Sequence, residues 1–250
     1  MKSKKNGSGY NERLFSGGLR RRLHLARFHW VADAIARLQI PLDSVFELGC
    51  FDGKLLDFLP APPGSYLGVD AGWEQGLAAA QQFRAGQPSL RFARATVPDE
   101  IPVAASEKFT LAVAMETLEH LSPELCEAYL EKIARHLDGY LLVTVPNEIG
   151  PVFLSKWLIK KLFSRDNYNY SLRELVNATF GRSSRIARHQ HKGFDYRALV
   201  ESIGQHFEIV EVSGHPAGFL PACLCFGIGI IARSRPRSHQ DRLTCRNLLS

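Results

Sequence analysis

The chain has 250 residues, of which 45% are hydrophobic and 22% are charged, with a formal net charge of +6. This composition is typical of a globular protein and excludes a disordered, collagen-like or fibrous chain. The longest apolar run, 219–232, is shorter than the roughly 20 residues of a membrane span, so no transmembrane helix is predicted. Five cysteines show no metal-binding or redox spacing, which favours a reducing, cytoplasmic compartment.

The positive charge lies at the two ends of the chain. Residues 1–30 carry a net charge of +7 and residues 233–250 carry +4, whereas the middle carries −5. Within the middle, residues 156–192 hold nine Lys and Arg against two acids. Basic segments attract anions such as RNA, anionic lipid headgroups or phosphorylated substrates, and they also occur as plain solvated tails. We expect a flexible basic segment over 1–22, a folded domain over 23–232 and a basic tail over 233–250.

The first half of the chain alternates between predicted strands and helices. Apolar positions at helical spacing predict a helix over 23–38, which Pro41 ends. The elements that follow are a strand at 44–47, helices at 54–59 and 73–84, and strands at 66–70, 90–93 and 109–114. Strands that alternate with helices predict a Rossmann-like α/β fold, in which a mostly parallel sheet carries helices on both faces.

The second half continues this alternation around an insert. Ser122 is a good helix cap and Pro123 suits the first helical position, so a helix is predicted from there until Gly139 closes it. Residues 147–195 interrupt the pattern after a fifth strand. The remaining elements are strands at 140–145, 207–212 and 226–232 and a helix at 195–203, which complete a seven-stranded sheet.

A glycine-containing turn follows the first strand, with the sequence Glu47-Leu-Gly49-Cys-Phe-Asp-Gly53. Glycine permits a sharp bend and lets a ligand approach the backbone. The spacing of Gly49 and Gly53 differs from that of phosphate-binding glycine motifs, which disfavours an NAD-dependent dehydrogenase. The acids Glu47 and Asp52 would repel a pyrophosphate, but they suit a cationic ligand. Asp70 ends the second strand, where a carboxylate can accept hydrogen bonds from both hydroxyls of a ribose.

Over about 44–232 the sequence resembles the class I S-adenosylmethionine (SAM)-dependent methyltransferases. The similarity lies in Phe46–Gly53, Gly68–Asp70, Met115–Leu121 and Leu142–Asn147. It implies SAM as the cofactor and the following SAM-binding residues: Glu47, Gly49, Cys50, Gly53, Asp70, Ala71, Trp73, Met115 and Glu116. The family often has an acid near the adenine amine after the third strand, whereas this sequence has Arg94-Ala-Thr-Val-Pro98 there.

Glu116, Glu119 and His120 are spaced to share one face of a helical turn. Two carboxylates and an imidazole suit a divalent cation such as Mg²⁺, Mn²⁺ or Zn²⁺. The same pattern resembles the small-RNA 3′-end 2′-O-methyltransferases and the ubiquinone-biosynthesis O-methyltransferases. That resemblance implies Glu116, Glu119, His120 and His191 as ligands of a metal that activates the acceptor oxygen. The alternative is a metal-free pocket in which His120 is the general base, and the expected catalytic residues are His120, His191 and Glu119.

The added segments are expected to select the methyl acceptor, because methyl transfer itself needs little more than in-line placement and a deprotonated nucleophile. Residues 151–163 are apolar on one side and rich in lysine, which predicts either a lid over the acceptor pocket or a peripheral membrane contact. His215 and Phe219 are expected to border that pocket. The predicted function is O-methylation of a small-molecule, glycan or lipid-linked acceptor. The alternatives are an RNA ribose 2′-O-methyltransferase and a non-catalytic partner subunit with the SAM fold, and the oligomeric state is left open.

Overall fold

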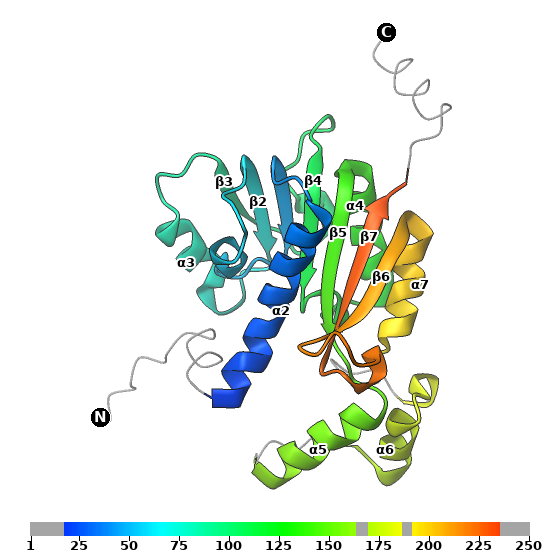
Figure 1. Ribbon diagram of the computed structural model, residues 1–250. Coiled ribbons are helices and arrows are strands. Elements are labelled where there is room, and N and C mark those ends of the chain that lie inside the picture. The colour runs from blue at the N-terminus through cyan, green and yellow to red at the C-terminus, as the bar shows by residue number, and fades with distance from the viewer. Residues whose placement is uncertain (1–17, 164–169, 187–191, 236–250) are drawn as a thin grey trace, which may run out of the picture.

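A computed structural model describes residues 18–163, 170–186 and 192–235 of the protein. They form a seven-stranded sheet with the strand order β3-β2-β1-β4-β5-β7-β6 (Figure 1). Strands β1 to β5 are parallel, and β7 is antiparallel to both of its neighbours, β5 and β6. The predicted Rossmann-like α/β fold is therefore confirmed. The strands are β1 (Ser44–Leu48), β2 (Ser65–Asp70), β3 (Leu90–Arg94), β4 (Phe109–Met115), β5 (Leu137–Pro146), β6 (Phe207–His215) and β7 (Gly227–Ser234).

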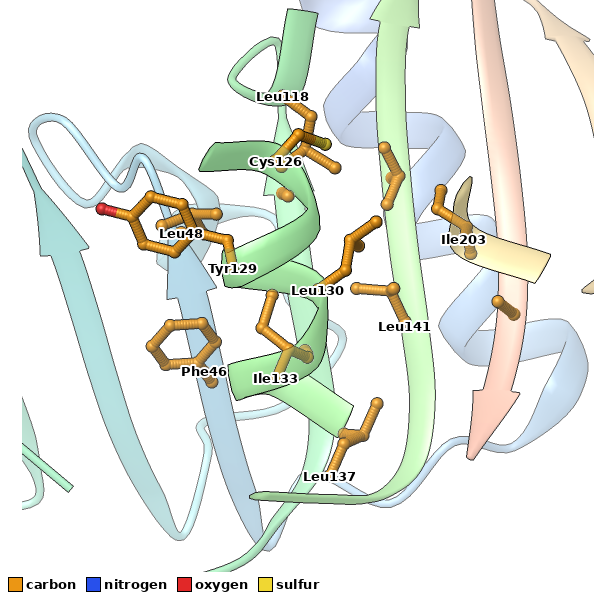
Figure 2. Close-up of a cluster of buried hydrophobic side chains, with 14 of the residues drawn as sticks. Phe46, Leu48, Leu118, Cys126, Tyr129, Leu130, Ile133, Leu137, Leu141 and Ile203 are labelled. Atoms are coloured by element: carbon orange, nitrogen blue, oxygen red, sulfur yellow. The ribbon is translucent and has the colours of Figure 1, made fainter. Parts of the chain in front are cut away.

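Helices cover both faces of the sheet (Figure 1). On one face α2 buries Phe28, Val31 and Ile35, which recur at helical spacing, against β1, β2 and β4. On the other face α4 and α7 enclose the larger core, and Figure 2 shows Tyr129, Leu130 and Ile133 of α4 pointing toward the strands. The helices are α2 (Gly18–Leu38), α3 (Gly76–Phe83), α4 (Pro123–His136), α5 (Pro151–Phe163), α6 (Leu172–Thr179) and α7 (Tyr196–His206).

Two of the predicted helices are shorter than expected. The segment 54–59 forms only a 3₁₀ turn at Lys54–Asp57. The segment 73–84 begins with a separate 3₁₀ turn, because Glu74 and Gln75 have left-handed backbone angles, with φ of +44° and +61°. Residues with positive φ cannot continue a right-handed α-helix, so α3 starts only at Gly76.

The predicted role of Gly139 as the end of a helix is wrong. Helix α4 ends at His136, and β5 begins with the next residue, Leu137, which pairs with Phe109 of β4. A Cβ atom on Gly139 would lie 2.0 Å from the backbone oxygen of Thr110. Glycine is therefore required here by the close approach of β4 and β5, and not by a helix cap.

The insert after β5 forms a separate small helical layer. Helices α5 and α6 project beyond the edge of the sheet at which β5 ends (Figure 1). Phe153 of α5 packs with Ala178 of α6 and with Ile186 to form a small core. No helix within the described ranges is long and apolar enough to cross a bilayer.

The ends of the folded domain differ slightly from the prediction. Helix α2 begins at Gly18, so residues 18–22 of the predicted flexible segment are helical. Strand β7 continues to Ser234, two residues into the predicted basic tail. Apart from Arg235, the rest of both basic segments lies outside the described residues.

Candidate active site

A pocket of about 820 Å³ lies at the carboxyl ends of β1, β2 and β4. Open α/β sheets bind their ligands at this edge. The predicted SAM-binding residues that line it are Glu47, Gly49, Cys50, Asp70, Ala71, Trp73, Met115 and Glu116. Gly53 is not among the lining residues, and its predicted contact with SAM stays a prediction. With a φ of +71°, Gly53 instead closes the turn, and its N–H donates to the Cys50 carbonyl at 2.8 Å.

The Asp70 carboxylate joins the loops that follow β1 and β2. Its Oδ1 accepts the backbone N–H groups of Gly72 at 2.7 Å and Trp73 at 3.3 Å. Its Oδ2 accepts the backbone N–H of Phe51 at 3.1 Å. Three backbone donors therefore fix the orientation of this carboxylate toward the pocket. The rings of Phe51 and Trp73, 5.9 Å apart between centroids, form part of the wall beside it.

Gly49 lets the loops after β1 and β4 come together. Its φ is +75°, and a Cβ atom there would lie 2.1 Å from Oγ1 of Thr117. That hydroxyl donates to the backbone oxygens of Met115 at 3.0 Å and Leu48 at 3.3 Å. Both the backbone conformation and the available space therefore require glycine at the floor of the pocket.

Glu47 is buried at the base of the pocket. The Tyr66 hydroxyl donates a hydrogen bond to its Oε2 at 2.5 Å. Burial raises the pKa of Glu47 to about 8, and the nearby charges of Asp52 and Asp70 act in the same direction. The hydrogen bond from Tyr66 lowers the pKa but does not outweigh burial. The carboxyl group is therefore mostly protonated at neutral pH in the ligand-free protein.

Glu119 and His120, two of the residues predicted for catalysis, also line the pocket. Glu119 is buried, and its Oε1 lies 3.9 Å from Nε2 of His120, whose side chain is 50% exposed. Burial and the charge of Glu116 hold the pKa of Glu119 well above its ordinary value, whereas Arg27 lowers it. The half-exposed imidazole of His120 is suited to general-base chemistry.

The expected shared helical face is not present. The 3₁₀ turn covers only Leu118–His120, and Glu116 precedes it with a left-handed φ of +51°. The Glu116 carboxylate instead accepts a 3.4 Å hydrogen bond from the Thr144 hydroxyl. The prediction from spacing fails because the positive φ of Glu116 turns its side chain out of the helical arrangement that would place it on one face with Glu119 and His120.

The described residues do not fit a divalent cation. In residues 18–163, 170–186 and 192–235, no three His, Cys, Asp or Glu side chains are gathered closely enough to hold a metal ion. Glu116, Glu119 and His120 therefore do not make the predicted ligand set by themselves. His191, the fourth predicted ligand and a catalytic candidate, lies outside the described residues.

Residues 10–40 were among the added segments expected to select the acceptor, but the sequence did not identify the residues of α2 that line the pocket. His24, Arg27 and Phe28 all line the pocket, and their spacing places them on one face of the helix. The Arg27 guanidinium lies 5.2 Å from the centre of the Phe28 ring. Helical spacing identifies Phe28 as part of an apolar face, but it does not show that the start of this face reaches beyond the sheet to a pocket.

Beyond β3, where the family often has an acid, Ala95 and Thr96 line the pocket. The Glu100 carboxylate accepts hydrogen bonds from the backbone N–H of Thr96 at 2.6 Å and from its hydroxyl at 2.8 Å. Glu100 therefore fixes the conformation of Thr96. The sequence has no acid in the segment 94–98, and the residues of this segment that line the pocket are Ala95 and Thr96.

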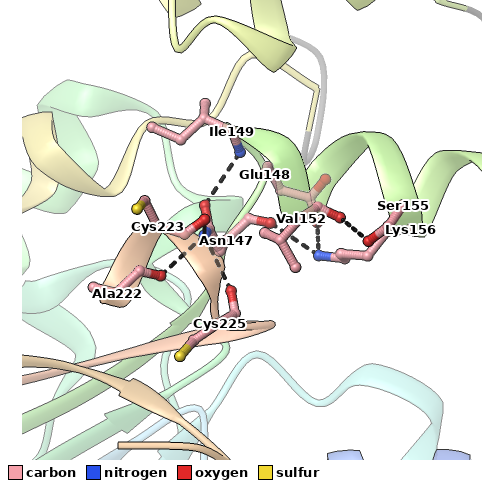
Figure 3. A network of polar contacts seen from close by, with 9 residues as sticks. All are labelled: Asn147, Glu148, Ile149, Val152, Ser155, Lys156, Ala222, Cys223 and Cys225. Atoms are coloured by element: carbon pink, nitrogen blue, oxygen red, sulfur yellow. Dashed lines mark hydrogen bonds and ion pairs between the residues drawn. The ribbon is translucent and has the colours of Figure 1, made fainter. Parts of the chain in front are cut away.

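A buried asparagine ties the pocket rim to the insert (Figure 3). The side-chain amide of Asn147 donates to the carbonyls of Cys225 at 3.0 Å, Ala222 at 3.3 Å and Cys223 at 3.4 Å. The next residue, Glu148, lines the pocket and pairs with Lys156 of α5 at 2.8 Å. The end of β5, the loop before β7 and helix α5 thus meet at one edge of the pocket.

Two other residues expected at the acceptor pocket are not among its lining residues. His215 is buried, with its ring 6.4 Å from that of Trp30, and a Cβ atom on Gly227 would lie 2.1 Å from its Cε1. Phe219 is exposed on the loop before β7. His215 therefore has a packing role against β7 rather than a position on the pocket wall.

Comparison with known proteins indicates a methyltransferase domain. Residues 45–139 match the family described as "Methyltransferase domain". No curated protein matches the sequence. Among solved structures, a SAM-dependent methyltransferase from Clostridium acetobutylicum has a TM-score of 0.63 at 11% identity, covering 91% of this chain and 99% of that one.

Two further structures contain S-adenosylhomocysteine. The N-methyltransferase NodS from Bradyrhizobium japonicum has a TM-score of 0.54 at 14% identity, covering 90% of this chain and 96% of that one. The magnesium protoporphyrin IX methyltransferase from Synechocystis has a TM-score of 0.51 at 16% identity, covering 89% and 92%. At these identities the structural similarity shows the shared fold.

The family match adds to the fold because it covers the residues on which the sequence motif depends. The segment 45–139 contains the Glu47–Gly53 turn, Asp70 and the Glu116–His120 segment. Those residues surround a single pocket at the edge of the sheet where SAM is expected. Residues 45–139 therefore contain a methyltransferase domain, and the described residues have the fold of SAM-dependent methyltransferases.

Proposed function

We propose that the protein transfers the methyl group of SAM to an oxygen atom of a small-molecule, glycan or lipid-linked acceptor. The observation that carries this proposal is the pairing of His120 with Glu119 in the same pocket as Gly49 and Asp70. The glycine and the aspartate would hold the cofactor, and the histidine would meet the acceptor. An imidazole that takes the proton of a hydroxyl can activate it, so this reaction does not require a metal ion.

The reaction requires one bond to form and one to break. The acceptor oxygen attacks the SAM methyl carbon in line with the carbon–sulfur bond, and the electron pair of that bond remains on sulfur as S-adenosylhomocysteine leaves. The imidazole of His120, whose side chain is half-exposed in the pocket, takes the hydroxyl proton and then passes it to water.

Support for a lipid-linked acceptor comes from the insert. On α5 the apolar residues Val152 and Phe153 are buried and Leu158 is 46% exposed, and the membrane contact predicted for 151–163 stays a prediction. Leu172 and Val176 of α6 and Phe180, which directly follows the helix, are exposed by 82%, 52% and 71%. These residues are four apart and form one stripe, which we call the α6 stripe.

The charge around the α6 stripe also fits a lipid surface. Arg173 and Arg182 are exposed beside it, and the Arg182 guanidinium lies 5.9 Å from the Phe180 ring centre. The acid on this helix, Glu174, is paired with Lys192 at 2.8 Å. An apolar stripe flanked by arginines suits the interface of an anionic bilayer, from which a lipid-linked acceptor would enter the pocket.

RNA methylation has less support from the described residues. In the segment that resembles the small-RNA enzymes, Phe194 is buried in the core and Asp195 caps α7 through the Arg197 backbone N–H at 3.0 Å. Both residues therefore have structural explanations. His191, at the start of that segment, lies outside the described residues.

The test uses purified protein, SAM labelled in its methyl group, and a cell extract as the source of acceptors. We expect label in an organic-soluble or small-molecule fraction, and its loss with His120→Asn. The control is His29→Asn, because His29 is an exposed histidine of α2 that does not line the pocket. Label that ribonuclease releases would instead make the protein an RNA methyltransferase. A parallel reaction with chelator tests the metal-assisted alternative, which needs His191.

A further inference from the structure

Tyr66, Gly68 and Glu47 form a compact arrangement beneath the pocket. Glu47 of β1 and Gly68 of β2 are neighbours in the sheet register. Tyr66 lies two residues before Gly68 on the same face of β2, and its hydroxyl reaches Oε2 of Glu47. A Cβ atom on Gly68 would lie 2.7 Å from the Tyr66 hydroxyl oxygen. Glycine at this position therefore leaves room for the phenol to cross to Glu47.

The surroundings of Glu47 contain more negative than positive groups. Asp52 and Asp70 disfavour its ionisation, and the Cys50 thiol lies close by on the same loop. Helix α2 contributes His24 and Arg27 to the same pocket. Among the residues that the structure describes, Tyr66 is the hydrogen-bond donor to this carboxyl group. Both side chains are buried, so water does not readily replace the phenol.

We propose that Tyr66 is a positioning residue for SAM, which holds Glu47 toward the ammonium group of the cofactor, and that cofactor binding releases a proton from Glu47. This inference rests on the pocket being the SAM site and is independent of which acceptor is methylated. The proton leaves through the pocket to solvent. The charge that remains on Glu47 then pairs with the cofactor ammonium and accepts the phenol hydrogen bond, which is stronger to a carboxylate than to a neutral acid.

The direction of the pH effect follows from the state of Glu47 in the free protein. With a pKa of about 8, the carboxyl group holds its proton at pH 7. SAM carries a sulfonium and an ammonium, so it binds more tightly to the ionised form. The affinity for the cofactor should therefore rise as the pH increases toward 8 and then level off.

The experiment is calorimetric titration of the full chain with S-adenosylhomocysteine, which retains the methionine ammonium, in two buffers that differ in ionisation enthalpy. At pH 7 the wild-type protein should release close to one proton per ligand, and Glu47→Gln should remove this contribution. Both proteins bind the same ligand, so a difference in proton release between them is due to Glu47. Tyr66→Phe should bind about tenfold more weakly at pH 7, since it removes a hydrogen bond to a charged group.

The pH profile separates positioning from simple packing. In Tyr66→Phe the rise in affinity should move to higher pH, and Gly68→Ala should act in the same way by displacing the phenol. The control is Tyr140→Phe, which removes a hydroxyl from β5 outside the pocket and should bind like wild type. Equal weakening at every pH, or unchanged proton release in Glu47→Gln, would overturn the inference. Failure of the folded wild-type protein to bind the ligand would overturn the SAM assignment itself.

Discussion

At the cofactor end of the pocket, the Asp70 carboxylate is fixed by three backbone N–H groups, and Gly49 lies against Thr117 with no room for a side chain. At the acceptor end, His120 lies half-exposed on a 3₁₀ turn, and Glu148 is held by Lys156 from the insert. The first end is built from strand ends and backbone, whereas the second combines a side chain from the turn after β4 with one that the insert holds. We therefore expect that changes at the acceptor end can alter acceptor choice without altering SAM binding.

The largest effect is expected at the acceptor end. His120→Asn should lower kcat by about 10²- to 10⁴-fold, because it removes the proposed general base. The dissociation constant for SAM should remain within about threefold of wild type, since the cofactor end is intact. Steady-state kinetics with the identified acceptor, together with calorimetry for SAM, measure the two quantities. Equal losses in SAM affinity and kcat would show that the two ends are not separable.

Asp70→Ala tests the cofactor end, and here the SAM affinity is expected to change rather than kcat. Loss of the carboxylate removes its three backbone hydrogen bonds and the predicted ribose contact, so SAM should bind at least about 100-fold more weakly. At saturating SAM, kcat should change little. Asp99→Ala is the control, because Asp99 is exposed and does not line the pocket. A loss of less than tenfold in affinity would contradict the proposed role of Asp70.

The backbone of the cofactor end can be tested through stability. Gly49→Ala should lower the free energy of unfolding by about 2–4 kcal/mol, because it adds a steric clash with Thr117 to the strain of a positive φ. Gly86→Ala is the matched control, since Gly86 has a φ of +82° but a Cβ atom there would meet nothing within 4 Å. It should cost only about 1 kcal/mol. Denaturant unfolding of both variants measures the difference, and equal losses would show that space around Gly49 is unimportant.

The smallest effect concerns the insert. Replacing Leu172, Val176 and Phe180 by serine should reduce binding to vesicles that contain anionic lipid by about five- to tenfold, with little effect on SAM affinity. Phe83→Ser is the control, because Phe83 is 79% exposed but lies on α3, away from the insert. Co-sedimentation with vesicles measures binding. Equal binding by the triple variant and wild type would remove the support for a membrane-delivered acceptor.

Local signals explain how much of the cofactor end could be predicted from the sequence. Gly49 follows a short apolar strand, and Asp70 ends the next one, so the alternation of elements alone brings them to one edge of the sheet. Helix α4 was predictable at its start because Ser122 caps it, accepting the Leu125 N–H at 3.3 Å. These features depend on residues that are near one another in the chain.

Contacts between segments that are distant in the chain determined the features that the sequence did not predict. The change from helix to strand at Leu137 depends on pairing with Phe109, and a left-handed φ at Glu116 broke the expected helical face. Arg27 reaches the pocket only because α2 crosses the sheet, and Tyr66 meets Glu47 only because β1 and β2 pair in one register. The sequence by itself determined the fold class, since periodicity and turn residues are local, and its resemblance to a known family indicated the cofactor. Tertiary structure decided the acceptor end, because burial, sheet register and helix crossing arise only when separate segments pack together.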